Sequence, residues 1–137
     1  MQVQPYLVFE GRCEEALEFY RRSLGAEVTT LMRFRESPDQ SMVSPGSADK
    51  VMHASFRIGE TTLLASDGRC EGPPAFEGFS LSITVPDDGD AERVFNALSE
   101  KGTVVMPLEK TFWTSKFGML EDRFGLSWMV SVQSAQS

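Results

Sequence analysis

Two stretches decide the fold of this chain: CEEALEFYRRSLG at residues 13–25 and DGDAERVFNALSEKG at residues 88–102. In each stretch the apolar residues recur every three or four positions, which predicts an amphipathic helix of about three turns. A shift of 78 positions carries Ala16, Leu17 and Tyr20 onto Val94, Phe95 and Leu98. The two apolar stripes therefore share one register, which indicates that the chain repeats a single unit.

The ends of both helices have sequence signals. Gly25 stands where a left-handed residue ends a helix, so we expect it to close the first one. For the second helix, Asp88 or Asp90 is expected to cap the N-terminus and Gly102 to stop the C-terminus.

Strand-like segments surround the helices in the same order in both halves. Each half reads strand, helix, strand, strand, strand, so we predict an α+β fold of two tandem βαβββ units. The predicted strands are residues 3–9, 27–34, 51–58 and 61–66, and then 79–85, 103–106, 117–121 and 126–132.

The boundaries follow from this order. One domain is expected over residues 1–137, with unit 1 at 1–67, a linker at 68–78, unit 2 at 79–132 and a tail at 133–137. Long loops are expected at 36–50 and 107–116, and Gly59-Glu60 has the form of a hairpin turn.

The composition argues against two classes of partner, nucleic acids and membranes. The chain has 13 Lys plus Arg against 20 Asp plus Glu, a net charge of −7, which argues against nucleic-acid binding. It has no apolar run of about 18 residues, so no membrane partner is expected. Cys13 and Cys70 have no metal-ligand or redox spacing, and we expect two reduced thiols in a cytoplasmic protein.

One helix per unit can cover only one face of a sheet. Alternation along the strands predicts which residues lie on the other face. That face is either solvated or, if the sheet curves, the lining of a cup that Phe112 and Trp113 could close. Its expected members are His53, Ser55, Arg57, Ser80, Ser82, Thr84, Ser127, Met129 and Ser131.

His53 is the only histidine and is a candidate general base, because an imidazole can take up and release a proton near neutral pH. Arg57 follows on the same predicted face and could hold an anion. Asp67 and Glu121 are the carboxylates nearest to this face, although both also suit turn or rim positions. A structural, hydrogen-bonded role remains the alternative for His53.

The chain resembles the vicinal oxygen chelate superfamily of glyoxalases, bleomycin-resistance proteins and extradiol dioxygenases, and within it the PhnB-like proteins. The resemblance implies paired βαβββ units, a cup-shaped sheet with helices on its outer face, and a homodimer. The residues that carry it are Pro5-Tyr6-Leu7, Phe9-Glu10-Gly11, Glu15 to Tyr20, His53-Ala54, Leu64 to Asp67, Val105 to Leu108, Trp113, Phe117-Gly118 and Asp122 to Trp128.

In metal-dependent relatives, four strand residues hold a divalent ion. Carried over by the resemblance, these positions fall on Ser80, Met129, near Leu64, and on Gln4 or Tyr6. One weak ligand cannot hold a metal, so we predict no metal at this site and no cofactor. Some PhnB-like sequences have a methyltransferase name, yet no strand here leads into a Gly-rich cofactor-binding turn.

The leading hypothesis is a dimeric protein that binds a polar small molecule. Two alternatives stay open. The first is an enzyme of the lyase, isomerase or dioxygenase type, which uses either His53 as a base or an atypical metal site at His53, Asp67 and Glu121. The second is an interaction module with no ligand. The predicted ligand-binding residues are His53, Ser55, Arg57, Asp67, Ser80, Ser82, Phe112, Trp113, Glu121, Ser127 and Met129.

Overall fold

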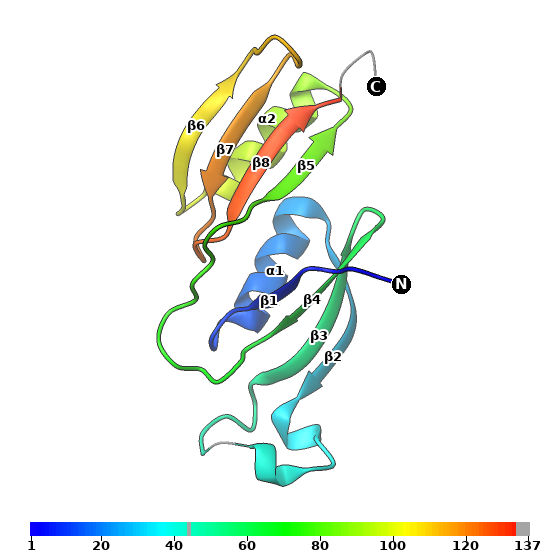
Figure 1. Ribbon diagram of the computed structural model, residues 1–137, viewed down its shortest axis with the longest axis vertical. Coiled ribbons are helices and arrows are strands. Elements are labelled where there is room, and N and C mark those ends of the chain that lie inside the picture. The colour runs from blue at the N-terminus through cyan, green and yellow to red at the C-terminus, as the bar shows by residue number, and fades with distance from the viewer. Residues whose placement is uncertain (44, 134–137) are drawn as a thin grey trace. The chain divides into compact units, whose positions relative to one another are not determined.

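The computed structural model describes residues 1–43 and 45–133 (Figure 1). The chain divides into two compact units, Met1–Pro74 and Ala75–Ser137, and the division falls within the linker expected at 68–78. Ser44, in the loop expected at 36–50, and residues 134–137, in the expected tail, lie outside the described residues.

Unit 1 is a four-stranded mixed sheet with one helix. Its sheet has the strand order β1-β4-β3-β2, with β1 parallel to β4 and the other neighbours antiparallel. Its elements are β1 (Tyr6–Val8), α1 (Cys13–Leu24), β2 (Glu27–Arg33), the 3-10 turns η1 (Phe34–Glu36) and η2 (Gln40–Met42), β3 (Val51–Ile58) and β4 (Thr61–Ser66).

The core of unit 1 forms where α1 packs on its sheet. The Tyr20 ring stacks on Phe56 of β3, with centroids 6.2 Å apart and planes 9° from parallel, and also contacts Phe9. Gly25 closes the helix with φ 70°, and its N–H donates to the Arg21 carbonyl. The predicted helix and its glycine end are confirmed.

Unit 2 repeats this topology, with the strand order β5-β8-β7-β6 and β5 parallel to β8. A helix again covers one face of the sheet (Figure 1). Its elements are β5 (Leu81–Val85), α2 (Asp88–Ser99), β6 (Thr103–Glu109), β7 (Phe117–Glu121) and β8 (Ser127–Val132).

The second helix differs from its prediction at both ends. Asp87 is the N-cap in place of Asp88 or Asp90, because its Oδ1 accepts the Asp90 N–H at 2.8 Å. Gly102 does not stop α2, which ends at Ser99. A Cβ at Gly102 would lie 2.3 Å from the Glu121 carbonyl oxygen, so glycine lets the chain pass this backbone closely.

Six strand boundaries also differ, and two of them are the ends of β1 at Val8 and of β2 at Arg33, each one residue earlier than predicted. β1 starts at Tyr6, after Pro5, which has no N–H to donate, and β5 starts only at Leu81. Sequence reasoning ended the sixth strand before Pro107, but β6 continues to Glu109 and shortens the following loop to 110–116. Proline is tolerated there because β6 is an edge strand. At β8, the strand begins at Ser127, one residue late.

The α+β class and the two βαβββ units are confirmed. Within residues 1–43 and 45–133, no helix has both the length and the apolar character to cross a membrane. The cup-shaped sheet, the homodimer and the cytoplasmic location stay predictions.

Candidate functional site

The face of the unit 1 sheet that α1 leaves uncovered, called here the unit 1 open face, gathers several of the predicted site residues. Ala54 and Phe56 are fully buried beneath α1, whereas His53 and Ser55 are half-buried and Arg57 is exposed. The register places Ser55 between Leu64 of β4 and Thr30 of β2. Alternation along β3 therefore predicted the face of these residues correctly.

Two contacts organise this face. The rings of Tyr6 and His53 lie 6.1 Å apart, so the imidazole has an aromatic neighbour from β1. Arg57 Nη2 donates to Glu27 Oε2 at 2.6 Å, and both side chains are more than half exposed. Glu27 already balances the guanidinium charge, so an anionic ligand would compete with this pair.

Asp67 is not on the open face. It is 1% exposed, and its two oxygens accept the backbone N–H groups of Cys13 and Val51, each at 2.7 Å. This carboxylate joins the start of α1 to the start of β3. The two groups it satisfies are 54 and 16 residues away in sequence, so no local pattern indicates this role.

The uncovered face of the second sheet, called here the unit 2 open face, has a row of methionines. Met106 lies opposite Met119, Met119 opposite Met129, and Met129 opposite Ser82. Met119 and Met129 are half-buried, whereas Met106 and Ser82 are exposed. Three thioether side chains from β6, β7 and β8 therefore lie side by side.

The aromatic residues of the loop at 110–116 border this face. Trp113 contacts the ring of Phe117 on β7, with centroids 5.4 Å apart. Thr114 anchors the loop because its buried Oγ1 donates to the Val132 carbonyl at 2.7 Å. Phe112 is 97% exposed and packs on Trp113 edge to face.

The remaining predicted residues also lie in unit 2. Glu121 ends β7, opposite Ser127 of β8 and Thr103 of β6. Ser80 precedes β5 and is exposed. Neither Ser80 nor Met129 is buried beneath α2, in agreement with the face to which alternation assigned them.

The divalent ion of metal-dependent relatives does not fit these residues. The carried-over positions supply a hydroxyl at Ser80, a thioether at Met129 and an alkyl chain at Leu64, whereas such ions prefer imidazole and carboxylate. In the described part of the chain, His, Cys, Asp and Glu form no cluster of three or more with metal-binding geometry. The atypical metal site expected at His53, Asp67 and Glu121 also loses Asp67, because this carboxylate is buried and accepts the backbone N–H of Cys13 at the start of α1.

Sequence reasoning missed a polar cavity of about 430 Å³ in unit 1. Its charged lining combines three cations and three carboxylates. The lining residues are Gly11, Glu14, Arg33, Arg35, Asp49, Lys50 and Asp67.

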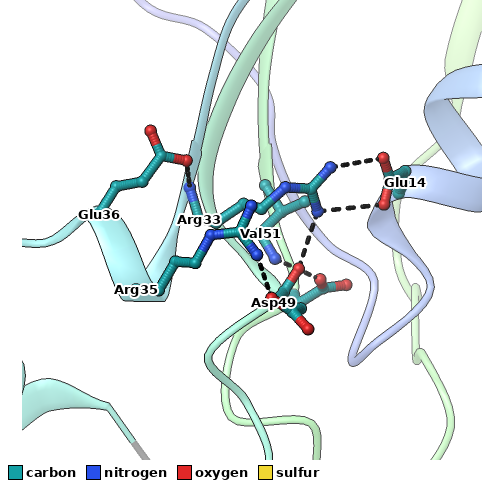
Figure 2. Close-up of polar contacts among 7 residues, drawn as sticks. Glu14, Arg33, Arg35, Glu36, Asp49 and Val51 are labelled. Atoms are coloured by element: carbon teal, nitrogen blue, oxygen red, sulfur yellow. Dashed lines mark hydrogen bonds and ion pairs between the residues drawn. The ribbon is translucent and has the colours of Figure 1, made fainter.

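Figure 2 shows how these charges pair. Arg33 donates to both carboxylate oxygens of Glu14, at 3.1 and 2.7 Å, and to the Asp49 carbonyl at 2.8 Å. Arg35 forms an ion pair with the Asp49 carboxylate. The hydrogen bond from Arg33 holds the pKa of Glu14 below its ordinary value. Because these pairs join α1 to the segment around η1, we assign the cavity a structural role.

The two cysteines border this region. Burial raises the pKa of the Cys13 thiol far above its usual range, and the charge of Asp67 adds to the effect. Burial also raises the pKa of Cys70, which is only partly exposed. Both thiols are free and neutral at pH 7, which gives neither the character of an activated nucleophile.

Nearly the whole chain is similar to known proteins. Residues 1–131 match the model of a family described as 3-demethylubiquinone-9 3-methyltransferase. Protein YjdN of Escherichia coli (strain K12) is 32% identical over 144 residues, covering 99% of this chain and 98% of that protein.

Solved structures agree with this match. Protein PA1353 from Pseudomonas aeruginosa is 41% identical, with a TM-score of 0.85 over 97% of this chain and 98% of that one. A PhnB protein from Bacillus cereus that has the same methyltransferase name is 27% identical, with a TM-score of 0.82 over 97% of this chain and all of that one. A glyoxylase/bleomycin resistance protein/dioxygenase domain from Frankia sp. EAN1pec shares the fold alone, at 13% identity and a TM-score of 0.64 over 100% of this chain and 95% of that domain.

Proposed function

Because the chain belongs to the family described as 3-demethylubiquinone-9 3-methyltransferase, the PhnB-like branch of the vicinal oxygen chelate superfamily, we propose that it binds a small molecule on the open faces of its sheets, without the usual metal. The observation that carries this proposal is the composition of those faces. They offer hydrogen-bonding groups at His53 and Ser55, and at Met129 a thioether stands where metal-dependent relatives place a ligand of the ion.

Binding by shape and hydrogen bonds suits such faces. Half-buried hydroxyl and imidazole groups can orient a ligand, and apolar neighbours supply contact area. Unlike a chelated substrate, a ligand held in this way needs no ion. We further propose that Phe112 and Trp113 close over it, since Trp113 already contacts the sheet through Phe117.

A thermal-shift screen over metabolites and antibiotics tests the proposal. A ligand that binds only the folded protein raises the melting temperature, and at a hundred times Kd it adds about 2.7 kcal/mol. The screen includes S-adenosylmethionine, for which we expect no shift because no Gly-rich cofactor turn follows a strand. A stabilising methyl donor would favour the activity in the family's name over simple binding.

Elemental analysis of protein purified without chelators tests the metal-free state. We expect no divalent ion in stoichiometric amount, because the donor set at the carried-over positions is too soft and too weak. One tightly bound ion per chain would contradict the proposal and favour a lyase or a dioxygenase.

A second candidate function is an enzyme in which His53 is the general base. It is favoured by the Tyr6 ring beside His53, which gives the imidazole a partly desolvated setting on an open face. His53→Ala separates the two functions: it abolishes turnover if His53 is the base, and it lowers the affinity of a ligand from the screen only about threefold if His53 is one contact among several. Asn96→Ala, an exposed position on α2 outside both open faces, is the matched control.

A further inference from the structure

We propose that the unit 2 open face binds a flat aromatic compound that carries a positive charge. The inference rests on the proposed small-molecule function and specifies its ligand class. Three features of unit 2 support it: the methionine row, the neighbouring aromatic residues and the distribution of charge.

The methionine row supplies an adaptable apolar surface. Because Met106, Met119 and Met129 are direct cross-strand neighbours, their side chains extend from adjacent positions on one face. Thioether chains are flexible and polarizable, and they make favourable contacts with aromatic rings. A flat ring system laid across β6, β7 and β8 would touch all three.

Aromatic side chains border the row on one side. Phe117 lies two residues before Met119 on β7, and its ring contacts Trp113. Trp113 is 48% exposed, so part of its indole ring remains available to a ligand. The surface therefore combines sulfur and aromatic contacts, which favours a planar ring over a flexible polar chain.

The charge of this face favours a cation. The four strands of unit 2, all of them within the described residues, contain Glu109 and Glu121 but no Lys or Arg. Glu109 lies opposite Phe117, and Glu121 ends the strand that carries Met119. Of the cations that flank these strands, Lys116 pairs with Glu92 on α2 and Arg123 pairs with Glu100, while Lys101 precedes β6 and Lys110 follows it.

The test uses two naphthalene probes with the same ring system and opposite charges, one with a trimethylammonium group and one with a sulfonate. Each is titrated into the full chain with isotope-labelled methionine methyl groups, and the methyl resonances are followed by NMR. We expect the cation to shift Met106, Met119 and Met129 through ring currents, while Met32 and Met52 of unit 1 stay unchanged. The sulfonate should bind roughly tenfold more weakly, because it meets two carboxylates.

Variants separate the aromatic contribution from the charge. Trp113→Ala should weaken binding of the cationic probe about tenfold, through lost ring contact. The double variant Glu109→Gln/Glu121→Gln should bring the two probes within about threefold of each other. Its matched control is Glu60→Gln/Glu77→Gln, which removes two exposed carboxylates that belong to none of the four strands of unit 2 and should leave the preference for the cation intact.

Several results would overturn the inference. If both probes bind equally, or if the sulfonate binds better, the ligand class is wrong, although small-molecule binding stands. If Met32 moves in place of the methionine row, the assignment to this face fails. If the three resonances shift with protein concentration alone and neither probe moves them, a second copy of the chain covers the face. Failure of the proposed function is recognised separately, as a metabolite screen in which nothing stabilises the protein.

Discussion

The two units share one topology, but different contacts join helix and sheet within each unit. Their open faces also differ. In unit 1, the buried Asp67 and the pairing of Arg33 with Glu14 connect α1 to distant backbone. In unit 2, the ring of Phe95 on α2 packs over Gly118 on β7. The difference teaches that a repeated backbone leaves the chemistry of each copy free to diverge.

The open faces follow the same division. Unit 1 presents Tyr6 beside His53 and the Arg57–Glu27 ion pair, whereas unit 2 presents Met106, Met119 and Met129. A ligand with hydrogen-bonding groups suits the first face and a flat aromatic cation suits the second. We expect substitutions in the two units to differ in their effect on stability, as well as in their effect on ligand binding.

The largest expected effect is on unit 1. Asp67→Asn keeps the shape of the side chain but removes its charge, and it places an amide N–H₂ group against one of the two backbone N–H donors. We expect this change to lower the free energy of unfolding by about 3 kcal/mol. Urea unfolding measures this cost. Glu60→Gln, in the exposed β3–β4 turn, is the control and should change stability by less than about 0.5 kcal/mol. An equally small change for Asp67→Asn would show that the carboxylate contributes nothing to holding unit 1.

Thiol labelling reports how unit 1 opens. Cys13 is fully buried and its pKa is strongly raised, so it should react with a thiol reagent at pH 8 at least about a hundredfold more slowly than Cys70. Mass spectrometry of timed samples gives both rates. Asp67→Asn should accelerate labelling of Cys13, because the backbone N–H of Cys13 donates to the Asp67 carboxylate. Comparable rates in the unaltered protein would contradict the buried placement of Cys13.

The next effect belongs to unit 2. A Cβ at Gly118 would lie 2.7 Å from Phe95 Cε2 and 3.1 Å from the Met106 carbonyl oxygen. Gly118→Ala should therefore cost about 2 kcal/mol, through overpacking between α2 and β7. The control is Gly89→Ala in α2, where a Cβ meets nothing closer than 3.5 Å and alanine should stabilise the helix by about 0.5 kcal/mol.

This variant also tests the independence of the units. If each unit is held by its own contacts, Gly118→Ala should lower stability in urea without accelerating the labelling of Cys13. Faster labelling would show that the loss of packing in unit 2 opens unit 1 as well.

The smallest effect concerns pH. The hydrogen bond from Arg33 keeps the pKa of Glu14 below its ordinary value of 4.5. The folded chain therefore binds this proton less readily than the unfolded chain, so the stabilisation is complete above pH 4.5 and is lost as the pH falls through the lowered value. Because Glu14 is largely exposed, Glu14→Gln should cost under about 1 kcal/mol at pH 7.

Urea unfolding at pH 7 and at pH 3 measures this effect, and the difference between Glu14→Gln and the unaltered chain should shrink at the lower pH. Glu15→Gln, one residue along the same helix and paired locally with Arg12, is the control. A difference that grows on acidification would contradict the sign of the pKa shift.

Local patterns predicted most of the elements. The bounds of α1, β3, β4 and β7 match the predictions because helical periodicity and alternation are read over neighbouring residues. The errors are informative. Pro107 did not end β6, because an edge strand needs no donor on its outer side, and Asp87 replaced Asp88 as the cap through a single side-chain contact.

Some features of the candidate site could be predicted from local patterns, and others could not. Alternation placed His53, Ser55 and Met129 on open faces, because the side-chain period of a strand is two. It could not find the partners of Asp67, which come from two remote points of the chain. Nor could it find Met119 as the centre of a methionine row, since that depends on the register of three strands.

By itself, the sequence determined the repeated unit, the helix faces and the side of each strand that turns from its helix, because these follow from spacing along the backbone. Tertiary structure alone decided which carboxylates are buried, which charges pair around the polar cavity and which methionines become neighbours. These outcomes depend on strand register and on contacts between residues far apart in the chain, and the spacing of residues within one element does not encode them.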